Sequence, residues 1–372
     1  MSWAITENTV CLVTGASAGI GKETARGLAA LGATVVIAGR HAARTERVAR
    51  ELRQSTSNPR VSHLIADFSS LDEVVRLAAE MTDRHAKLHI LINNAGVWHQ
   101  QRRDSHDGFD DTFAVNHLAP FLLTSLLRHR LIESAPARVI TVSSTLHKLS
   151  HRIRFHDLDH RRRLGWFGLA PYAHSKLANV LFSLELARRL EGTGVTSNCL
   201  HPGNVATTVV RDSRLLSVGI QVGRLFLLTP TEGARTSLHL ATAPELAGVT
   251  GGYFADCQQQ QPSSAGQDTE TASRLWRVSQ ALCRLDDRDV RRPEASTSDP
   301  KDRYEVTIRY REGVFASYAG LPVRTYSGVF HVQGADEVEA CDQARAEFEH
   351  LRRVSSVAWP RDIVEVVCRR LD

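Results

Sequence analysis

The 372-residue sequence is poor in the patterns that build metal sites, disulfide frameworks and membrane spans. Its six cysteines are scattered and form no CxxC or Cys/His ligand spacing, which argues against structural zinc and against a disulfide scaffold. No uncharged apolar run of about 18 residues occurs, and no basic leader precedes an apolar core at the N-terminus. We therefore expect a cytoplasmic protein in a reducing compartment, with no bound metal, no signal peptide and no integral membrane anchor.

Lysine is also scarce, because only positions 22, 87, 148, 176 and 301 carry it, and arginine supplies most of the positive charge. The formal net charge is +5 and the isoelectric point is about 9.0. The basic residues are nevertheless spread along the chain without interleaved aromatics, so no nucleic-acid partner is expected. The densest basic run, residues 147–163, is broken by acidic and apolar residues, and we expect a solvated loop there.

Short apolar runs alternate with helical patterns through the first three quarters of the chain. The expected strands are residues 9–15, 33–40, 61–68, 88–96, 137–144, 194–203 and 251–256. This rhythm is typical of βαβ units and a parallel sheet. It predicts one α/β domain over residues 1–285, with a Rossmann-like, doubly wound parallel sheet of seven strands.

The composition changes after residue 285. Residues 286–302 are rich in charge, Ser, Thr and Pro and lack apolar periodicity, so they are expected to be a linker. Residues 303–372 contain two alternating strands, an amphipathic helix and a last strand, which predicts a small α+β unit of ββαβ order. A unit of this size is marginal alone, and packing or self-association as a homodimer would stabilise it.

The stretch TGASAGIG, residues 14–21, follows the first expected strand and opens the first expected helix. Glycines let the backbone approach a pyrophosphate, and a helix N-terminus offers free N–H groups and a favourable dipole. The residues expected to bind a dinucleotide here are Gly15, Ser17, Gly19, Ile20 and Gly21.

The same letters also contain a GxSxG pattern, which is typical of the nucleophile elbow of hydrolases. A hydrolase needs strands before the elbow, and an acid and a histidine after it. This loop instead follows the first strand and is extended by Gly21. A Ser17→Ala change would abolish ester hydrolysis in that alternative and would only weaken cofactor binding in ours.

The end of the second expected strand bears on the choice of nicotinamide cofactor. NAD-selecting folds place a carboxylate there for the ribose hydroxyls, whereas a 2′-phosphate requires a cation. Residues 35–44 contain no carboxylate, Arg40 follows the strand, and Arg44 and Lys22 are close in sequence. The pattern favours NADP, with solvated surface cations as the alternative.

A tyrosine and a lysine lie four residues apart in PYAHSKLANV, residues 171–180. Positions i and i+4 share a helix face, so the Lys176 ammonium is expected near the Tyr172 phenol, where a cation lowers the phenol pKa. A carbonyl that receives hydride needs a proton donor and a second hydrogen-bond donor. Ser144, at the end of an expected strand, would be that second donor. Taken singly, the pair could be a surface pair and Ser144 a turn residue.

The motifs TGASAGIG, ADFSS, LINNAG, AVNHLAPFLLT, VITVSS, YAHSK and HPGNVAT occur in this order over roughly residues 6–285. The series resembles the short-chain dehydrogenase/reductase family, and within it the retinol dehydrogenase and WW-domain oxidoreductase branch. The resemblance implies a catalytic tetrad of Asn116, Ser144, Tyr172 and Lys176, with Asn116 in a proton relay to Lys176. Its other implied cofactor contacts are Asp67, Asn94, Ala95, Gly96, Tyr172, Lys176, Pro202, Gly203 and Thr207.

Two departures from that branch stand out. Its WW modules are absent, and the N-terminal anchor common among retinol dehydrogenases is not expected here. The apolar residues 213–228, after HPGNVAT, are expected to form a substrate lid, a core helix or a shallow membrane-surface contact. A lid implies a lipophilic substrate.

These observations predict an NADP-dependent oxidoreductase that moves hydride between the cofactor and a lipophilic aldehyde, ketone or alcohol. The alternative is a cofactor-binding regulatory or scaffold protein that acts through residues 303–372. An intact catalytic set argues against this alternative, since a pure sensor needs no proton donor. Deleting residues 301–372 and measuring turnover would discriminate between the two.

Overall fold

The computed structural model describes residues 3–158, 168–203, 228–285, 302–311, 325–334 and 362–371, with 337, 340–345 and 348 between the last two strands. The chain divides into two compact units, Met1–Arg292 and Pro293–Asp372, and each is described by itself. The expected linker lies outside the described residues apart from its last position. The expected domain boundaries stay a prediction.

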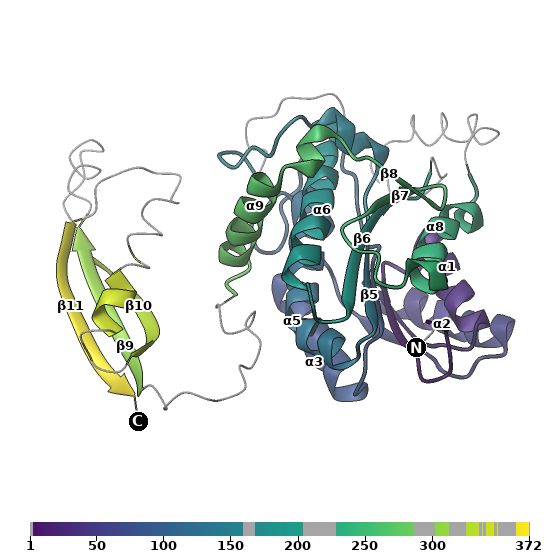
Figure 1. Cartoon of the computed structure of the whole chain (residues 1–372), viewed down its shortest axis with the longest axis horizontal. Helices are drawn as coiled ribbons and strands as arrows, with labels where there is room; N and C mark the ends of the chain where they lie inside the picture. Colours follow the sequence, from purple (N-terminus) through teal and green to yellow (C-terminus); the bar gives the residue numbers. More distant parts are fainter. Residues whose placement is uncertain are drawn as a thin grey trace. The chain divides into compact units, whose positions relative to one another are not determined.

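The larger unit alternates strands and helices (Figure 1). Its strands are β1 (Val10–Thr14), β2 (Thr34–Gly39), β3 (Val61–Ile65), β4 (Ile90–Asn93), β5 (Ala137–Val142), β6 (Val195–His201), β7 (Tyr253–Ala255) and β8 (Gln258–Gln260). Its α-helices are α1 (Gly19–Ala30), α2 (Ala42–Thr56), α3 (Leu71–Arg84), α4 (Asp111–Phe113), α5 (Ala119–Glu133), α6 (Leu169–Arg189), α8 (Pro230–Thr242) and α9 (Thr269–Leu282). Shorter helical turns are η1 (Ala114–Leu118), η2 (Thr145–Leu149), η5 (Pro244–Leu246) and η6 (Ser264–Gln267).

One sheet organises this unit, with strand order β3-β2-β1-β4-β5-β6-β7-β8. All pairs from β3 to β7 are parallel. Every residue of β4, β5 and β6 is buried, as expected for strands covered by helices on both faces. The predicted Rossmann-like, doubly wound fold is confirmed.

The structure adds an eighth strand that the sequence pattern does not predict. β7 and β8 form an antiparallel hairpin around Asp256 and Cys257, which both have positive φ, 51° and 62°. Such a two-residue turn usually carries Asn-Gly or Asp-Gly. The Asp-Cys turn lacks that signal, and all three β8 residues are glutamines, so neither turn nor strand is visible in the sequence.

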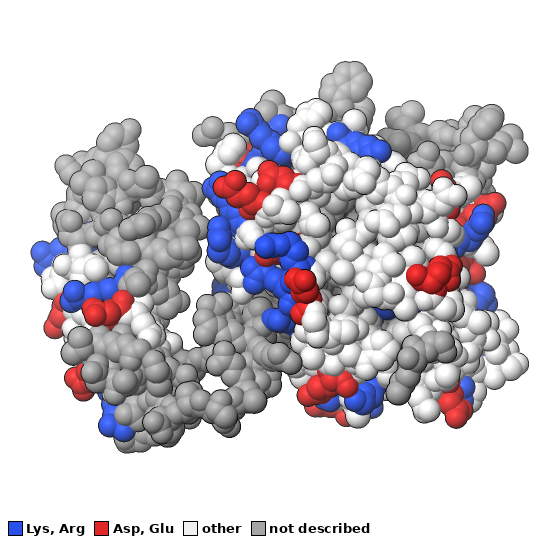
Figure 2. Space-filling view, viewed as in Figure 1, with Lys and Arg blue, Asp and Glu red and all other residues white. Residues whose placement is uncertain are grey.

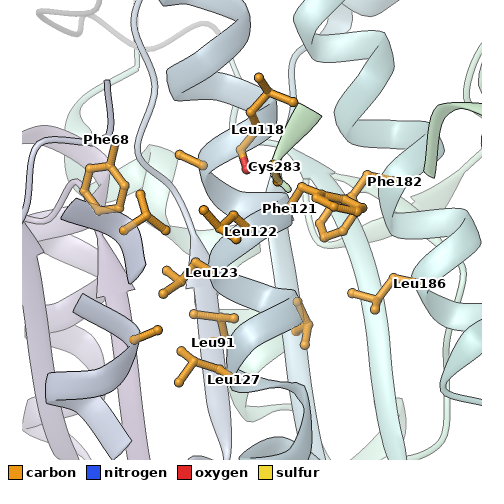
Figure 3. Packing of buried hydrophobic residues seen from close by; sticks show 14 of the residues in the cluster. Phe68, Leu91, Leu118, Phe121, Leu122, Leu123, Leu127, Phe182, Leu186 and Cys283 are labelled. Carbon is orange, nitrogen blue, oxygen red and sulfur yellow. Dashed lines mark hydrogen bonds between the residues drawn. The ribbon is translucent and has the colours of Figure 1, made fainter. Parts of the chain in front are cut away.

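Helices cover both faces of the sheet (Figure 1). Helices α3, α5, α6 and α9 pack on one face, and their side chains form the larger buried cluster. Figure 3 shows part of this cluster from close by, with Phe121 of α5 beside Phe182 of α6. Helices α1, α2 and α8 cover the other face around a mainly aliphatic cluster. The sheet therefore lies between two buried apolar clusters, one on each face.

The C-terminal end of α8 is held by a buried arginine of β5. Arg138, 4% exposed, donates hydrogen bonds to the carbonyl oxygens of Leu240 (2.8 Å) and Ala243 (2.9 Å). The Trp3 indole donates to the carbonyl oxygen of Ala241 (2.9 Å) and lies under the Arg138 guanidinium. A cation at this end of a helix also opposes the negative pole of the helix dipole.

The smaller unit is a three-stranded antiparallel sheet with order β10-β9-β11. Its strands are β9 (Asp302–Arg311), β10 (Thr325–Gly334) and β11 (Asp362–Leu371), with helical residues between β10 and β11. Ala340, Ala344 and Phe348 of that helical segment pack on Val306 and Ile308. The predicted separate α+β unit is confirmed.

The face of the molecule drawn in Figure 2 shows basic and acidic side chains in small mixed groups, separated by uncharged surface. Among the described residues, no helix combines the length and the apolar character needed to cross a membrane.

Candidate active site

The sequence order of the strands reverses between β1 and β4, which are neighbours in the sheet. In doubly wound folds, ligands bind beyond the carboxyl ends of the strands at this point. The glycine loop leaves β1 there, and Asn94 leaves β4. The Asn94 side chain donates to the carbonyl oxygen of Thr14 (2.8 Å), and the Thr14 hydroxyl accepts from the backbone N–H groups of Asn94 and Ala95 (both 3.0 Å). The two strand ends are therefore tied together.

Two glycines leave room that no other residue would leave. A Cβ on Gly15, whose φ is +65°, would lie 2.7 Å from the Ala95 Cα, and a Cβ on Gly21 would lie 2.3 Å from the Asn94 amide nitrogen. A side chain at position 15 would displace the Ala95 backbone, and a side chain at position 21 would displace the Asn94 side chain. The loop is thus shaped by contacts with the end of β4.

The N-terminus of α1 offers its N–H groups to a ligand. Its N-cap residue is Ala18, no side chain caps it, and its first turn has no acidic residue. Free N–H groups and the positive pole of the dipole suit a pyrophosphate. The residues present therefore fit the phosphates of a dinucleotide, which Gly15 to Gly21 would hold.

The carboxyl end of β2 carries Arg40, an exposed residue whose guanidinium donates to the His41 ring (3.1 Å). Gly39 precedes it and lets the β2 end approach Ser17, because a Cβ there would lie 3.2 Å from the Ser17 Cβ. Lys22 is held by Glu51 at 2.7 Å. Of the three cations proposed for a 2′-phosphate, Lys22 is thus already paired.

Asp67 follows β3 at the same edge of the sheet. Its carboxylate accepts from the Ser69 N–H (3.0 Å), and its own N–H donates to Glu73 (3.2 Å). These contacts fix the turn between β3 and α3. The predicted contact of Asp67 with an adenine stays a prediction.

Ser144 lies two residues after β5 and is the N-cap of η2, where its hydroxyl accepts a hydrogen bond from the Leu146 N–H (3.2 Å). Two histidines that we did not predict hold this segment. The His147 ring contacts the Ser144 carbonyl oxygen (2.7 Å) and accepts from the Ser263 N–H (3.1 Å), and His201 accepts from the Thr145 N–H (3.3 Å). His147 is fully buried, so the expectation of a solvated loop over 147–163 is wrong at its first residue.

Tyr172 and Lys176 lie on one face of α6, as predicted. The Lys176 Nζ is 5.6 Å from the centre of the Tyr172 ring and donates to the Val142 carbonyl oxygen (3.0 Å). The Ser144 side chain lies close enough to the Tyr172 phenol to lower its pKa. Phenol, hydroxyl and ammonium therefore meet at the ends of β5 and α6.

The pKa values of this pair differ from the expectation. Burial raises the pKa of Tyr172 to about 12, although its hydrogen bond with Ser144 opposes the change. Burial lowers the pKa of Lys176 to about 8. In the protein alone, the loss of hydration outweighs the expected lowering of the phenol pKa by the ammonium, and Tyr172 is protonated at neutral pH.

Asn116 lies in η1, a π-helical turn between α4 and α5. Turns of this kind are frequent at functional sites. Its side-chain amide makes two hydrogen bonds with the backbone of Val97. The amide oxygen accepts from the Val97 N–H (2.7 Å), and the amide nitrogen donates to the Val97 carbonyl oxygen (3.0 Å). The same nitrogen donates to the Ser175 hydroxyl (2.9 Å). Asn116 thus joins the segment after β4 to α6.

Trp98 is a further site residue that we did not predict. Its ring stacks on Tyr172, with centroids 4.9 Å apart and planes 17° apart. The residues on either side of Trp98 are both held in place. Val97 is hydrogen-bonded to Asn116, and His99 pairs with Asp111 at 2.6 Å. The sequence gives no signal for this stack.

The structure brings Asn116, Ser144, Tyr172 and Lys176 together with the end of β4. A Cβ on Gly96 would lie 3.3 Å from the Asn116 side-chain oxygen and 3.5 Å from the Lys176 Nζ. Pro202 and Gly203 directly follow β6 at the same edge of the sheet. Thr207 and the expected lid, apart from Leu228, lie outside the described residues.

The chain belongs to the short-chain dehydrogenase/reductase family, as the sequence motifs predicted. The model of the short chain dehydrogenase family matches residues 9–153. The family uses a nicotinamide cofactor, which excludes the hydrolase alternative. Binding of that cofactor by the glycine loop stays a prediction.

Within the family, the chain lies close to the retinol dehydrogenases. It is 46% identical to retinol dehydrogenase 12 of Mus musculus over 270 residues, which are 73% of this chain and 84% of that protein. It is 42% identical to retinol dehydrogenase 14 of Homo sapiens over 294 residues, covering 74% and 86%. The chain is therefore an oxidoreductase of the retinol dehydrogenase branch.

Solved structures of similar fold support the membership of the family. A crystal structure of an uncharacterised protein from Mycobacterium paratuberculosis matches with a TM-score of 0.61 and 31% identity, over 76% of this chain and 96% of that one. The RhlG/NADP active-site complex of Pseudomonas aeruginosa matches with a TM-score of 0.54 and 27% identity, over 66% and 93%.

Proposed function

We propose that the protein is an NADP-dependent oxidoreductase that interconverts a lipophilic alcohol and the corresponding aldehyde or ketone. The observation that carries the proposal is the meeting of Ser144, Tyr172 and Lys176 beside the cofactor loop. The Ser144 hydroxyl lies close enough to the phenol to lower its pKa, and the ammonium lies 5.6 Å from the centre of the phenol ring. A proton donor, a second hydrogen-bond donor and a cation are the groups that carbonyl reduction needs.

The chemistry divides between the residues as follows. When bound, the nicotinamide supplies the hydride in reduction and accepts it in oxidation. Ser144 donates a hydrogen bond to the substrate oxygen, and Tyr172, protonated at neutral pH, transfers its proton to that oxygen as negative charge develops. Lys176 stabilises the phenolate that remains. Asn116 holds the Val97 peptide and Ser175 and belongs to the relay that returns a proton through Lys176.

Tyr172→Phe tests this role directly. The change should reduce the rate of NADPH-dependent carbonyl reduction by about 10²- to 10⁴-fold, because the general acid is lost. NADPH absorbance at 340 nm, followed with a panel of lipophilic aldehydes and ketones, measures it. Tyr326→Phe, in the smaller unit, is the matched control and should leave the rate unchanged. Equal rates for the parent and the Tyr172 variant would refute the assignment, as would a parent enzyme inactive on the whole panel.

NADP is proposed over NAD because Arg40 is an exposed cation at the end of β2 and no carboxylate stands beside it in residues 35–44. A hydrogen-bonded contact with a charged group contributes about 1.5–3 kcal/mol. Arg40→Asp should therefore lower the ratio of NADP to NAD affinity about tenfold or more. Arg47→Asp makes the same change of charge on the exposed side of α2 and should leave the ratio unaltered. An unchanged ratio in both variants would favour NAD or an unselective enzyme.

A lipophilic substrate is proposed from the similarity to proteins named retinol dehydrogenases and from the apolar residues 213–228 that follow the HPGNVAT motif. The substrate class is tested by comparing kcat/KM for retinoid-like aldehydes with kcat/KM for short polar aldehydes. A preference for the polar aldehydes would refute the proposal of a lipophilic substrate.

A cytoplasmic location is proposed because all six cysteines are free thiols, as suits a reducing compartment.

A further inference from the structure

Strand β11 forms one edge of the small sheet, and it is ten residues long. Among the described residues, no strand pairs with its outer edge. Ile363, Val364 and Val367 of this strand are 36%, 50% and 44% exposed. A long, exposed apolar edge offers a row of N–H and C=O groups to another strand.

The opposite edge, β10, is less suited to pairing. Among its described side chains, one large apolar residue is exposed, Val329, which is followed by a buried Phe330 and preceded by Gly328. Glycine weakens a strand because it has no side chain to pack. The apolar character of the small sheet therefore concentrates at β11.

The core of the small unit also ends at β11. Val366 and Cys368 point to the same side of the sheet as Val306 and Ile308, which are fully buried beside them. Val366 and Cys368 are nevertheless only half-buried. Another strand beside β11 would continue the sheet and cover these two side chains.

The sequence of β11 is complementary to itself. Glu365 and Arg369 lie two residues before and two residues after Val367, and all three share the outer face because side chains alternate. When two copies run antiparallel with Val367 opposite Val367, Glu365 of each copy faces Arg369 of the other. A shift of two residues either way sets Val367 opposite one of these charges and leaves them unpaired.

The charges of this face support the same register. Glu365 already binds Arg309 of β9 at 2.7 Å. Arg369 lies opposite Glu305 of β9, whose carboxylate contacts the His331 ring at 3.4 Å. In the antiparallel arrangement, each Arg369 gains a carboxylate from the other copy. Opposite charges on facing strands stabilise a pair of strands, and like charges destabilise it.

We propose that the smaller unit is a self-association module in which β11 pairs antiparallel with β11 of a second copy, with Val367 at the two-fold axis. The three-stranded sheets of the two copies then form one continuous sheet. The partner is this chain itself. This inference is independent of the catalytic proposal, since its tests measure association and not turnover.

A cysteine at the two-fold axis tests the register. Facing Cα atoms in an antiparallel pair are about 4.5–5.5 Å apart, which suits a disulfide. Val367→Cys in the full chain should therefore cross-link to a covalent dimer under mild oxidation. Val329→Cys is the matched control, because Val329 lies on β10 in the same row of the sheet and is even more exposed, 54% against 44%. This variant and the parent chain should stay monomeric on a non-reducing gel. Cross-linking at 329 and not at 367 would overturn the proposal.

A charge exchange tests the complementarity. Glu365→Arg or Arg369→Glu alone should raise the dimer dissociation constant at least tenfold, because each replaces two attractive pairs by two repulsive ones. The double variant should restore association to within about threefold of the parent. Glu337→Arg, on the exposed side of the neighbouring helical segment, controls for net charge.

Sedimentation of the full chain over a range of concentrations measures these constants. The proposal is overturned if the parent sediments as a monomer throughout. It is also overturned if a dimer forms whose dissociation constant does not change in the single variants.

Discussion

At the scale of single residues, the Tyr172 ring has neighbours with opposite effects on its proton. Ser144 stabilises the phenolate through a hydrogen bond, whereas burial, to which the stacked Trp98 contributes, raises the pKa to about 12. Trp98 is held in place by Asn116 through Val97. The proton affinity of the phenol is therefore set partly by an indole that belongs to the segment after β4.

Trp98→Ala should expose the Tyr172 ring to water and lower the phenol pKa. Alcohol oxidation needs the phenolate, so the rise of its rate with pH should begin at a lower pH in this variant. Loss of an aromatic stack of about 0.5–1.5 kcal/mol should also reduce kcat about two- to tenfold through poorer positioning. Trp98→Phe keeps a stacked ring and should retain the parent profile. Identical pH profiles in the parent and the alanine variant would show that Trp98 has no influence on the phenol.

Lys176 predicts how carbonyl reduction responds to pH. Burial lowers the pKa of its ammonium to about 8, so the charge that stabilises the developing phenolate is present below this pH and is lost above it. The rate of reduction at saturating NADPH should accordingly fall as the pH rises through about 8. Lys176→Arg retains its charge to high pH and should remove this decline, although at a lower rate. A parent profile that stays level between about pH 7 and 10 would contradict the assignment.

The sequence was sufficient to find the residues whose chemistry is rare. A Tyr and a Lys at helical spacing, in a chain with so few lysines, are informative without a structure. Trp98, His147 and His201 were missed because their roles depend on contacts with segments far away in the sequence. The expected direction of the Tyr172 pKa change was wrong for the protein alone, because the sequence carries no measure of burial.

At the scale of elements, the N-terminus of α1 lacks a stabilising side-chain cap and is the proposed phosphate site. Ala18 leaves the first N–H groups of the helix without a side-chain partner. Ala18→Asn and Ala18→Asp should each raise the free energy of unfolding without cofactor by about 0.5–2 kcal/mol, because both residues cap helices well. Thermal unfolding measures this gain.

The same two variants should differ in cofactor affinity. The carboxylate introduced by Ala18→Asp would repel the pyrophosphate, so this variant should bind NADPH more weakly than the uncharged, isosteric Ala18→Asn. Fluorescence titration of NADPH gives both affinities. If the Asp variant binds as tightly as the Asn variant, the α1 N-terminus does not hold the phosphates.

Elements with a strong period were predictable, and short ones were not. The seven parallel strands follow from apolar runs separated by helical patterns, since both faces of the sheet are buried. β8 has only three residues, all exposed glutamines, and is defined by its hydrogen bonds to β7. The π-helical turn at Asn116 is likewise invisible, because its sequence continues the helical pattern on both sides.

At the scale of the whole molecule, each unit has its own buried core, and the chain should unfold in two transitions. Phe348, 5% exposed, packs against Tyr310 and Phe330 in the small core. Phe348→Ala should cost about 3–5 kcal/mol, which is comparable with the whole stability of a unit this small. The small-unit transition should disappear in calorimetry while the other transition and the turnover persist.

Phe121→Ala is the corresponding core substitution in the larger unit. Phe121 is fully buried between Phe182 and Trp276. Its loss should lower the other transition and leave that of the small unit in place. A single transition that moves in both variants would mean that the two units unfold as one.

The two histidines beside Ser144 give the protein an acid-labile active site. Both accept hydrogen bonds from backbone N–H groups, and only an unprotonated ring nitrogen can accept. Burial lowers the pKa of His201 to about 4 and also lowers that of His147. The unfolded chain therefore takes up protons first, and stability falls as the pH drops below about 6.5. Mild acid should therefore inactivate the enzyme, because protonation of the two histidines breaks the hydrogen bonds that hold the segment around Ser144. Far-UV circular dichroism should still show an intact sheet at this pH. Loss of activity would then occur at a higher pH than global unfolding.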